Sequence, residues 1–162
     1  MPRPTGVAAA VRRAVLACAL VDLAALLAHV LELPNKLGLP GPLWLAVQQR
    51  LYRGWGPVLG PFEVAALAGA WLLAALVGRR SPAFARMLLA ALCLTAALAL
   101  FFAVVRPVNL ALAGWTPATL PADWPRWRLR WEVGHAARAA LVLVAVGALA
   151  SGPARVPPPA RR

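Results

Sequence analysis

Two short segments of the sequence place a histidine and a glutamate three residues apart within apolar surroundings. The first reads HVLELPNKL and contains His29 and Glu32, and the second reads EVGHAAR and contains Glu132 and His135. Residues three or four apart on a helix share a face, so each segment can present an imidazole beside a carboxylate. A histidine oriented by a carboxylate is a typical general base, because imidazole titrates near neutral pH. The pattern therefore favours proton-transfer chemistry.

Both segments extend into longer stripes of ionisable side chains at helical spacing. The first stripe contains Asp22, His29, Glu32 and Lys36, and the second contains Arg128, Trp131, Glu132, His135 and Arg138. Arg138 lies one turn beyond His135, where its guanidinium could hold a developing oxyanion or pair with Asp22. Ionisable groups at membrane depth normally face the interior of a helix bundle, because lipid solvates them poorly. We therefore expect the two stripes to line one interior site.

Metal chemistry is a second interpretation of the same residues. Helices that carry Glu-x-x-His, joined by glutamates from other helices, build di-iron carboxylate sites. The possible ligand set is His29, Glu32, Glu63, Glu132 and His135. The match is incomplete, because the first pair runs in reverse order and the third apolar stretch offers only Asn109. We therefore predict no cofactor, and keep a metal- or haem-binding membrane protein as an alternative.

Purely structural interpretations also stay open. His29 and Glu32 can form an interfacial salt bridge where a helix leaves the membrane, and Asp22 and Arg138 can form an ion pair that fixes helix register. The tryptophans near the fourth apolar stretch can anchor the chain at the membrane interface; these are Trp115, Trp124, Trp127 and Trp131. A structural or accessory membrane subunit is the corresponding functional alternative.

The composition determines the class of protein that carries these residues. The chain is 62% hydrophobic, has a mean hydropathy of +0.71 and only 14% charged residues, against about 25% in soluble domains. Its net charge of +12 comes from small arginine clusters at the ends of apolar runs, where membrane proteins carry basic residues. No basic and aromatic module of the kind that binds single strands is present. We therefore expect no nucleic-acid binding, and a lipid bilayer is the expected partner.

Four stretches are long enough to cross a bilayer, which takes about 20 residues. They span residues 14–34, 62–78, 84–105 and 132–151, and the last should extend back toward Asp123 as a helix cap. The first stretch is too long for the apolar core of a signal peptide, so we expect it to be retained. Residues 1–13 form a basic flank, 42–55 an amphipathic interfacial helix, 107–124 an apolar loop and 152–162 a disordered Pro-rich tail. The prediction is an all-α, four-span membrane bundle with a Trp-rich cap.

Four spans place both chain ends on one side of the membrane. The short basic flanks on that side favour a cytoplasmic location in a bacterial plasma membrane, with the Trp-rich cap outside. Both histidines, both asparagines, the single lysine and four of the five acids then lie at the outer end of the bundle. We expect a pocket there, lined by His29, Glu32, Glu63, Asn109, Glu132, His135 and Arg138.

The arrangement of these motifs resembles a known family. HVLELPNKL near the end of a first span, PVN after a third, and W…W…RW…H..R at the start of a fourth are similar to the anthrone-oxygenase-like family of small four-span membrane proteins. The resemblance covers roughly residues 14–150, and most members of that family have no known function. Its matching positions in this chain are Pro107, Asn109, Trp115, Arg130, Trp131, His135 and Arg138.

The resemblance implies a membrane oxidoreductase, because characterised members are similar to cofactor-independent oxygenases that convert anthrones to anthraquinones. The substrate would be an apolar aromatic small molecule. We expect catalytic roles for His135, Arg138, Glu132, His29 and Glu32, and substrate contacts from Asn109, Trp115, Trp131 and Glu63. His135 would remove the acidic proton of the anthrone, and Arg138 or Asn109 would stabilise the enolate oxygen.

Overall fold

Four helices of this protein are long and apolar enough to cross a lipid bilayer. In the computed structural model, which describes residues 4–151, they are α1 (Pro4–Leu37), α3 (Trp55–Val77), a compound helix from Phe84 to Gly114, and α6 (Trp124–Ala150). The shortest of the four, α3, has 23 residues, enough for about 30 Å of hydrocarbon. No strand occurs between residues 4 and 151. The predicted all-α, four-span bundle is confirmed.

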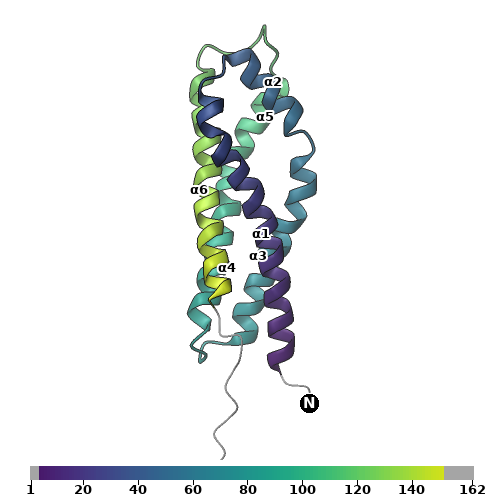
Figure 1. Cartoon of the computed structure of the whole chain (residues 1–162), viewed down its shortest axis with the longest axis vertical. Helices are drawn as coiled ribbons and strands as arrows, with labels where there is room; N and C mark the ends of the chain where they lie inside the picture. Colours follow the sequence, from purple (N-terminus) through teal and green to yellow (C-terminus); the bar gives the residue numbers. More distant parts are fainter. Residues whose placement is uncertain (1–3, 152–162) are drawn as a thin grey trace, which may run out of the picture.

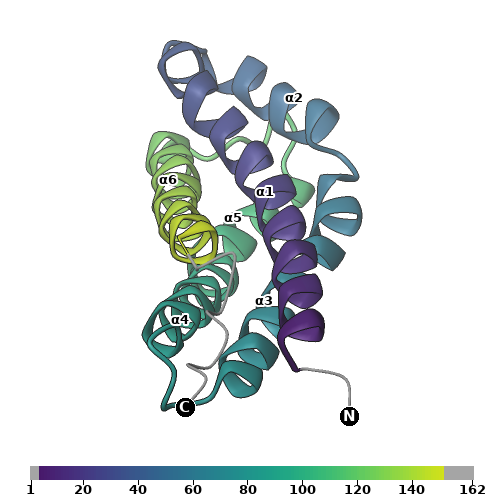
Figure 2. The same ribbon diagram turned by 60° about the horizontal axis from the view of Figure 1, so that its bottom comes forward.

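The long helices run along one axis, and a short helix, α2 (Gly41–Leu51), closes one end of the bundle (Figure 1). Contacts join α1 to α3, α3 to α4 (Phe84–Leu100), α4 to α6 and α6 back to α1. Figure 2 shows α4 and α6 side by side, with α1 and α3 across from them. The start of α1 and the end of α6 lie at the end of the bundle opposite α2. Which side of the membrane that end faces stays a prediction.

Two different cores hold the bundle together. Near the chain ends lies an alanine core, in which more than half of the buried residues are alanine and none is aromatic. Small side chains let helices approach closely, and Ala66, Ala70 and Ala74 on α3 form part of this contact. Near α2 lies an aromatic core, whose buried members are Trp44, Leu45, Val105, Val108, Leu112 and Trp131.

The compound helix departs from the sequence prediction, which ended the third span at Val105 and placed a loop after it. After α4 the chain forms one π-helical segment, η1 (Phe101–Val105), and then α5 (Arg106–Gly114). Pro107 has no N–H to donate to the carbonyl of Ala103, four residues earlier. Arg130 Nη2 donates to that carbonyl at 2.9 Å. A neighbouring helix thus supplies the missing hydrogen bond, and the helix continues through the proline.

Other boundaries also differ from the prediction. α3 begins at Trp55 rather than at 62, because Pro57 falls in its first turn, where an N–H has no helical partner anyway. α2 ends at Leu51 and not at 55, and residues 4–13 of the predicted basic flank belong to α1. α6 follows Asp123 as expected, although the Asp123 side chain makes no capping hydrogen bond. The predicted tail, 152–162, lies outside the described residues.

Candidate functional site

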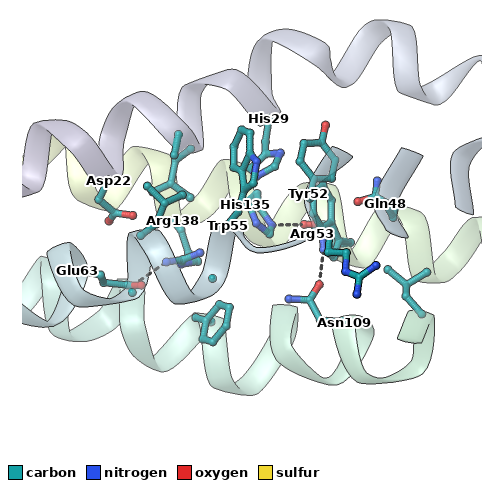
Figure 3. Close-up of a pocket in the computed structure, with 18 of the residues that line it drawn as sticks. Asp22, His29, Gln48, Tyr52, Arg53, Trp55, Glu63, Asn109, His135 and Arg138 are labelled. Carbon is teal, nitrogen blue, oxygen red and sulfur yellow. Dashed lines mark hydrogen bonds and ion pairs between the residues drawn. The ribbon is translucent and has the colours of Figure 1, made fainter. Parts of the chain in front are cut away.

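A pocket of about 990 Å³ lies inside the bundle, next to the aromatic core. It is bounded by α1, α2, α3, α6 and the η1–α5 segment, and its volume is that of a site for a drug-sized molecule. Figure 3 shows Asp22, Glu63 and Arg138 at one end, His29, His135 and Trp55 in the middle, and Asn109 and Gln48 toward the other end. Polar groups from four separate parts of the sequence therefore meet along a single cavity.

The two histidines touch each other in the middle of the pocket. The His29 ring on α1 and the His135 ring on α6 have centroids 4.4 Å apart and planes at 80°. Trp131 stacks on His135 at 4.1 Å, while Tyr52 and Trp55 pack against His29 at 4.6 and 5.3 Å. Both imidazoles are buried. The antiparallel placement of the two sequence motifs at equal depth is as the sequence indicated.

The hydrogen bonds of the imidazoles differ from the prediction. His135 Nδ1 lies 3.1 Å from the carbonyl oxygen of Trp131, one turn earlier on α6. A carbonyl only accepts, so Nδ1 of neutral His135 carries the proton and Nε2 keeps its lone pair. His29 Nδ1 is buried and has no hydrogen-bond partner within residues 4–151. Neither histidine is oriented by a carboxylate, because both nearby glutamates bind Lys36.

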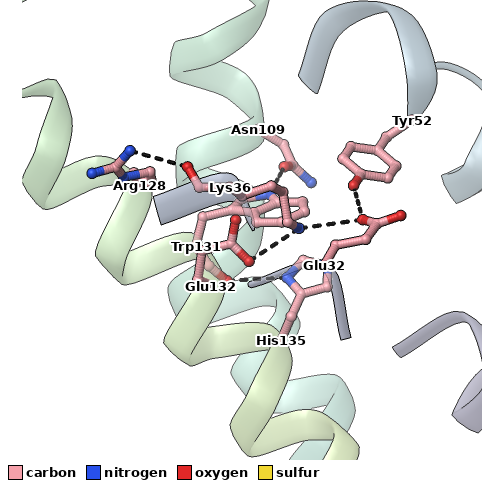
Figure 4. Close-up of polar contacts among 8 residues, drawn as sticks. All are labelled: Glu32, Lys36, Tyr52, Asn109, Arg128, Trp131, Glu132 and His135. Carbon is pink, nitrogen blue, oxygen red and sulfur yellow. Dashed lines mark hydrogen bonds and ion pairs between the residues drawn. The ribbon is translucent and has the colours of Figure 1, made fainter. Parts of the chain in front are cut away.

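Those glutamates form an ion cluster beside the pocket, shown in Figure 4. Lys36 Nζ lies 3.1 Å from Glu132 Oε2 and 3.5 Å from Glu32 Oε2, and the Lys36 residue is only 4% exposed. Its ammonium also sits 4.8 Å from the centre of the Trp131 ring, a cation–π distance. The cluster ties the C-terminal end of α1 to α6. Glu32 and Glu132 are absent from the pocket wall.

Arg128 reinforces the same junction. Its Nη1 donates to the carbonyl oxygens of Lys36 and Leu39, each at 3.1 Å. The last carbonyls of a helix have no partner within the helix, so a cation placed there satisfies them and favours the negative end of the helix dipole. The C-terminal end of α1 is therefore fixed against α6 by side chains of both charges.

Tyr52, which the sequence analysis did not single out, connects this cluster to the pocket. Its hydroxyl donates to Glu32 Oε2, and its ring contacts His29. Burial raises the pKa of Tyr52, and the hydrogen bond to Glu32 and the nearby negative charge raise it further. The sequence signal that could have identified Tyr52 is that it is the single tyrosine of the chain and lies in an amphipathic stretch. Gln48 and Phe101 also line the pocket and were not predicted.

The deep end of the pocket holds a buried ion pair. Arg138 Nη2 donates to Glu63 Oε1 at 2.7 Å, and Arg138 Nε donates to the carbonyl of Ala97 at 3.2 Å. The guanidinium also lies 5.1 Å from the centre of the Phe101 ring. From the sequence, Asp22 is the expected ion-pair partner of Arg138. The hydrogen-bonded partner is instead Glu63, which α3 presents directly to the guanidinium.

The four predicted substrate contacts all line the pocket: Glu63, Asn109, Trp115 and Trp131. Asn109 Oδ1 accepts from Trp131 Nε1 at 2.8 Å, so α5 fixes the ring that stacks on His135. Gln49 on α2 donates Nε2 to the carbonyls of Leu112 and Trp115 at 2.7 and 2.9 Å. These bonds hold the outer end of the pocket together.

The possible metal ligands do not converge. Within residues 4–151, no group of three or more His, Cys, Asp or Glu side chains is arranged to hold a metal ion. Glu63 is bonded to Arg138 and Glu132 to Lys36. The two imidazoles are in edge-to-face contact, which leaves no planar gap between them for a haem.

No protein-family model matches this chain, and no curated protein or solved structure is significantly similar to it. The resemblance to the anthrone-oxygenase-like family therefore stays a prediction from sequence motifs.

Proposed function

We propose that this protein is a membrane oxygenase that removes a proton from an apolar aromatic small molecule of the anthrone kind and lets the resulting carbanion react with oxygen. The observation that carries the proposal is the contacting imidazole pair on the wall of a pocket whose deep end contains Arg138. The aromatic wall suits a flat ring system, and the pocket volume suits three fused rings. Apolar helices around the site suit a substrate that partitions into lipid.

His135 is the proposed general base. Its Nδ1–H is held by the Trp131 carbonyl, so the Nε2 lone pair is the free basic site of the neutral ring. Stacking on Trp131 and edge contact with His29 fix the ring plane. A base that is held in one orientation needs no rearrangement before proton transfer.

Arg138 is the proposed group that stabilises the enolate oxygen. It lies three residues after His135, about 4.5 Å further along the helix axis. In an anthrone the acidic CH₂ group and the carbonyl face each other across the central ring. A substrate whose CH₂ lies at His135 therefore directs its oxygen toward Arg138, where a preformed cation favours the developing negative charge.

The oxidation balances with molecular oxygen as the co-substrate. Proton transfer to His135 leaves an enolate, whose electron pair forms a C–O bond to oxygen. The peroxide takes the proton back from His135, and loss of water, with removal of the second C–H proton, gives the quinone. One anthrone and one O₂ thus yield one anthraquinone and one water. In this scheme the chain supplies the base, the oxyanion site and the apolar pocket.

The test is oxidation of anthrone by the purified protein in lipid vesicles, followed by oxygen uptake and quinone absorbance. The His135→Ala variant should lower kcat about 100-fold or more, the usual contribution of general-base catalysis. Leu72→Ala, on the exposed face of α3, is the matched control and should keep full activity. Protein-free vesicles give the rate of spontaneous oxidation.

Two results would contradict the proposal. One is an anthrone oxidation rate in wild-type vesicles no greater than in protein-free vesicles. The other is a His135→Ala variant that stays folded and oxidises anthrone at the wild-type rate. If His135 has only a structural role, its variant loses folding, measured by thermal unfolding in detergent, together with any activity. Metal analysis of the wild type and of the His29→Ala/His135→Ala double variant tests the metal- or haem-binding alternative.

A further inference from the structure

Asp22 is a buried acid that forms no salt bridge or hydrogen bond with Arg138, Glu63 or either histidine. It is 4% exposed, lines the deep end of the pocket, and its Oδ2 makes no hydrogen bond to any residue between 4 and 151. It is close enough to Glu63 and Arg138 to interact with their charges. Figure 3 shows its carboxyl on the same side of the pocket as Arg138 and Glu63. An unpartnered buried polar atom of this kind requires an explanation.

We propose that Asp22 is a catalytic residue of this site, which holds its proton and, together with Arg138, hydrogen-bonds the enolate oxygen of the substrate. This inference rests on the proposed function, because it assigns a role toward the same substrate. It adds a residue that determines which substrates bind: those with an oxygen at the end that lies beside Asp22 and Arg138.

Charge counting supports the neutral form of Asp22. The charged groups that face it are Glu63 on α3 and Arg138 on α6, and these two already form an ion pair at 2.7 Å. On its own helix, the next ionisable side chain along the stripe is His29, about 10 Å away along the axis. An ionised Asp22 would therefore be a buried charge without its own counter-ion, which costs several kcal/mol. The protonated acid avoids that cost and leaves an O–H donor.

A protonated aspartate beside a second donor is a known solution for stabilising an enolate. A carboxylic acid that stays neutral in an apolar site can donate a hydrogen bond to the oxyanion without first losing charge. Arg138 supplies the positive charge, and its Nη2 and Nε are already bonded to Glu63 and Ala97. Asp22 lines the same pocket, and its Oδ2 has no such bond, so a proton on this carboxyl is not already donated from Oδ2 to another residue between 4 and 151.

The experiment compares two variants of Asp22 by activity and by the binding of an enolate mimic. Asp22→Asn keeps the shape and an N–H donor, whereas Asp22→Leu keeps only the branching at Cγ and has no polar atom. The probes are 2-naphthol, whose hydroxyl oxygen can accept a hydrogen bond as the substrate oxygen would, and naphthalene, which has no oxygen. Binding is measured in detergent by probe fluorescence, and activity by anthrone oxidation in vesicles.

The proposal expects Asp22→Leu to lower kcat about 100-fold, as loss of one oxyanion donor does. It expects up to about 10-fold weaker 2-naphthol binding, because one hydrogen bond to the probe oxygen is lost, and unchanged naphthalene binding. Asp22→Asn should stay within about 10-fold of the wild type in kcat. Wild-type activity in Asp22→Leu overturns the proposal. Equal losses in both variants also overturn it, because they indicate that an ionised carboxylate is required.

An infrared spectrum tests the protonation state without any activity. With only five acidic side chains in the chain, the C=O band of a protonated acid can be assigned by difference. The wild type should show this band at neutral pH, and Asp22→Asn should lack it. Absence of the band in the wild type overturns the proposal, even if a variant misfolds. Failure of the proposed function looks different: wild-type protein neither oxidises anthrone nor prefers 2-naphthol to naphthalene.

Discussion

The two halves of this bundle use the same four helices in opposite ways. In the half near the chain ends, alanines at the contacts let α1, α3, α4 and α6 approach until the interior is filled. In the half near α2, the buried core includes Trp44 and Trp131, and a pocket of about 990 Å³ lies beside it. Small side chains at the helix contacts thus go with the closed half of the bundle, and large aromatic side chains go with the open half.

The halves also differ in what holds them. The alanine core depends on close apolar packing, whereas the pocket half depends on directed polar contacts such as those of Lys36 and Arg138. Adding volume to a closely packed core lowers its stability. Removing one charge from a buried ion cluster lowers stability as well, because the remaining charge is left without a partner.

The largest expected effect is in the pocket half. Among residues 4–151, Lys36 is the only cation in a salt bridge with Glu132, so Lys36→Met leaves a buried carboxylate and should lower the free energy of unfolding by about 3–5 kcal/mol. The measurement is unfolding in mixed micelles, followed by tryptophan fluorescence. The double variant Lys36→Met/Glu132→Gln should recover most of the loss. A single variant as stable as the wild type would show that the cluster does not hold this half together.

A smaller effect should come from the alanine core. Ala70→Leu adds a side chain where the exposed fraction is 0%, so overpacking should destabilise the bundle by about 1–3 kcal/mol. The matched control is Ala113→Leu, which adds the same volume at an exposed residue that lines the pocket. The control should change the free energy of unfolding by less than about 0.5 kcal/mol. Equal losses of unfolding free energy in the two variants would contradict the distinction between a filled half and an open half.

The smallest expected effect is a dependence of the stability of the fold on pH, through Tyr52 at the boundary of the pocket. Burial and the Glu32 contact raise the pKa of Tyr52 above its ordinary value, so folding favours the neutral phenol. That stability is fully present below about pH 10, where unfolded tyrosine titrates, and is lost as the pH rises through the folded pKa. Because Tyr52 is the only tyrosine, tyrosinate absorbance reports it alone.

Glu32→Gln should lower that titration midpoint, since it removes the charge beside the phenol. Tyr52→Phe gives the background absorbance of the tryptophans. A midpoint at the ordinary value in the folded wild type would show that Tyr52 is not held against Glu32.

Much of the fold followed from the sequence because hydrocarbon imposes strict rules. Length and apolarity of the four stretches predicted the four spans, and the spacing of His29 and His135 on antiparallel helices predicted their meeting. The predicted helix boundaries were wrong at two prolines. Pro107 and Pro61 are ordinary helix boundaries in isolation, but here the helix continues through both, and a carbonyl left free by Pro107 is bonded by Arg130 from another helix.

By itself, therefore, the sequence determined the class of protein, the four spans, and the end of the bundle at which polar residues gather. Hydropathy and helical periodicity act along the chain, so they can be read without knowing what lies opposite. Only the tertiary structure decided the partners: Glu63 and not Asp22 for Arg138, Lys36 for both glutamates, and a backbone carbonyl for His135. Partner choice depends on helix rotation and on distances of a few ångströms between helices, which side-chain packing sets across the whole bundle.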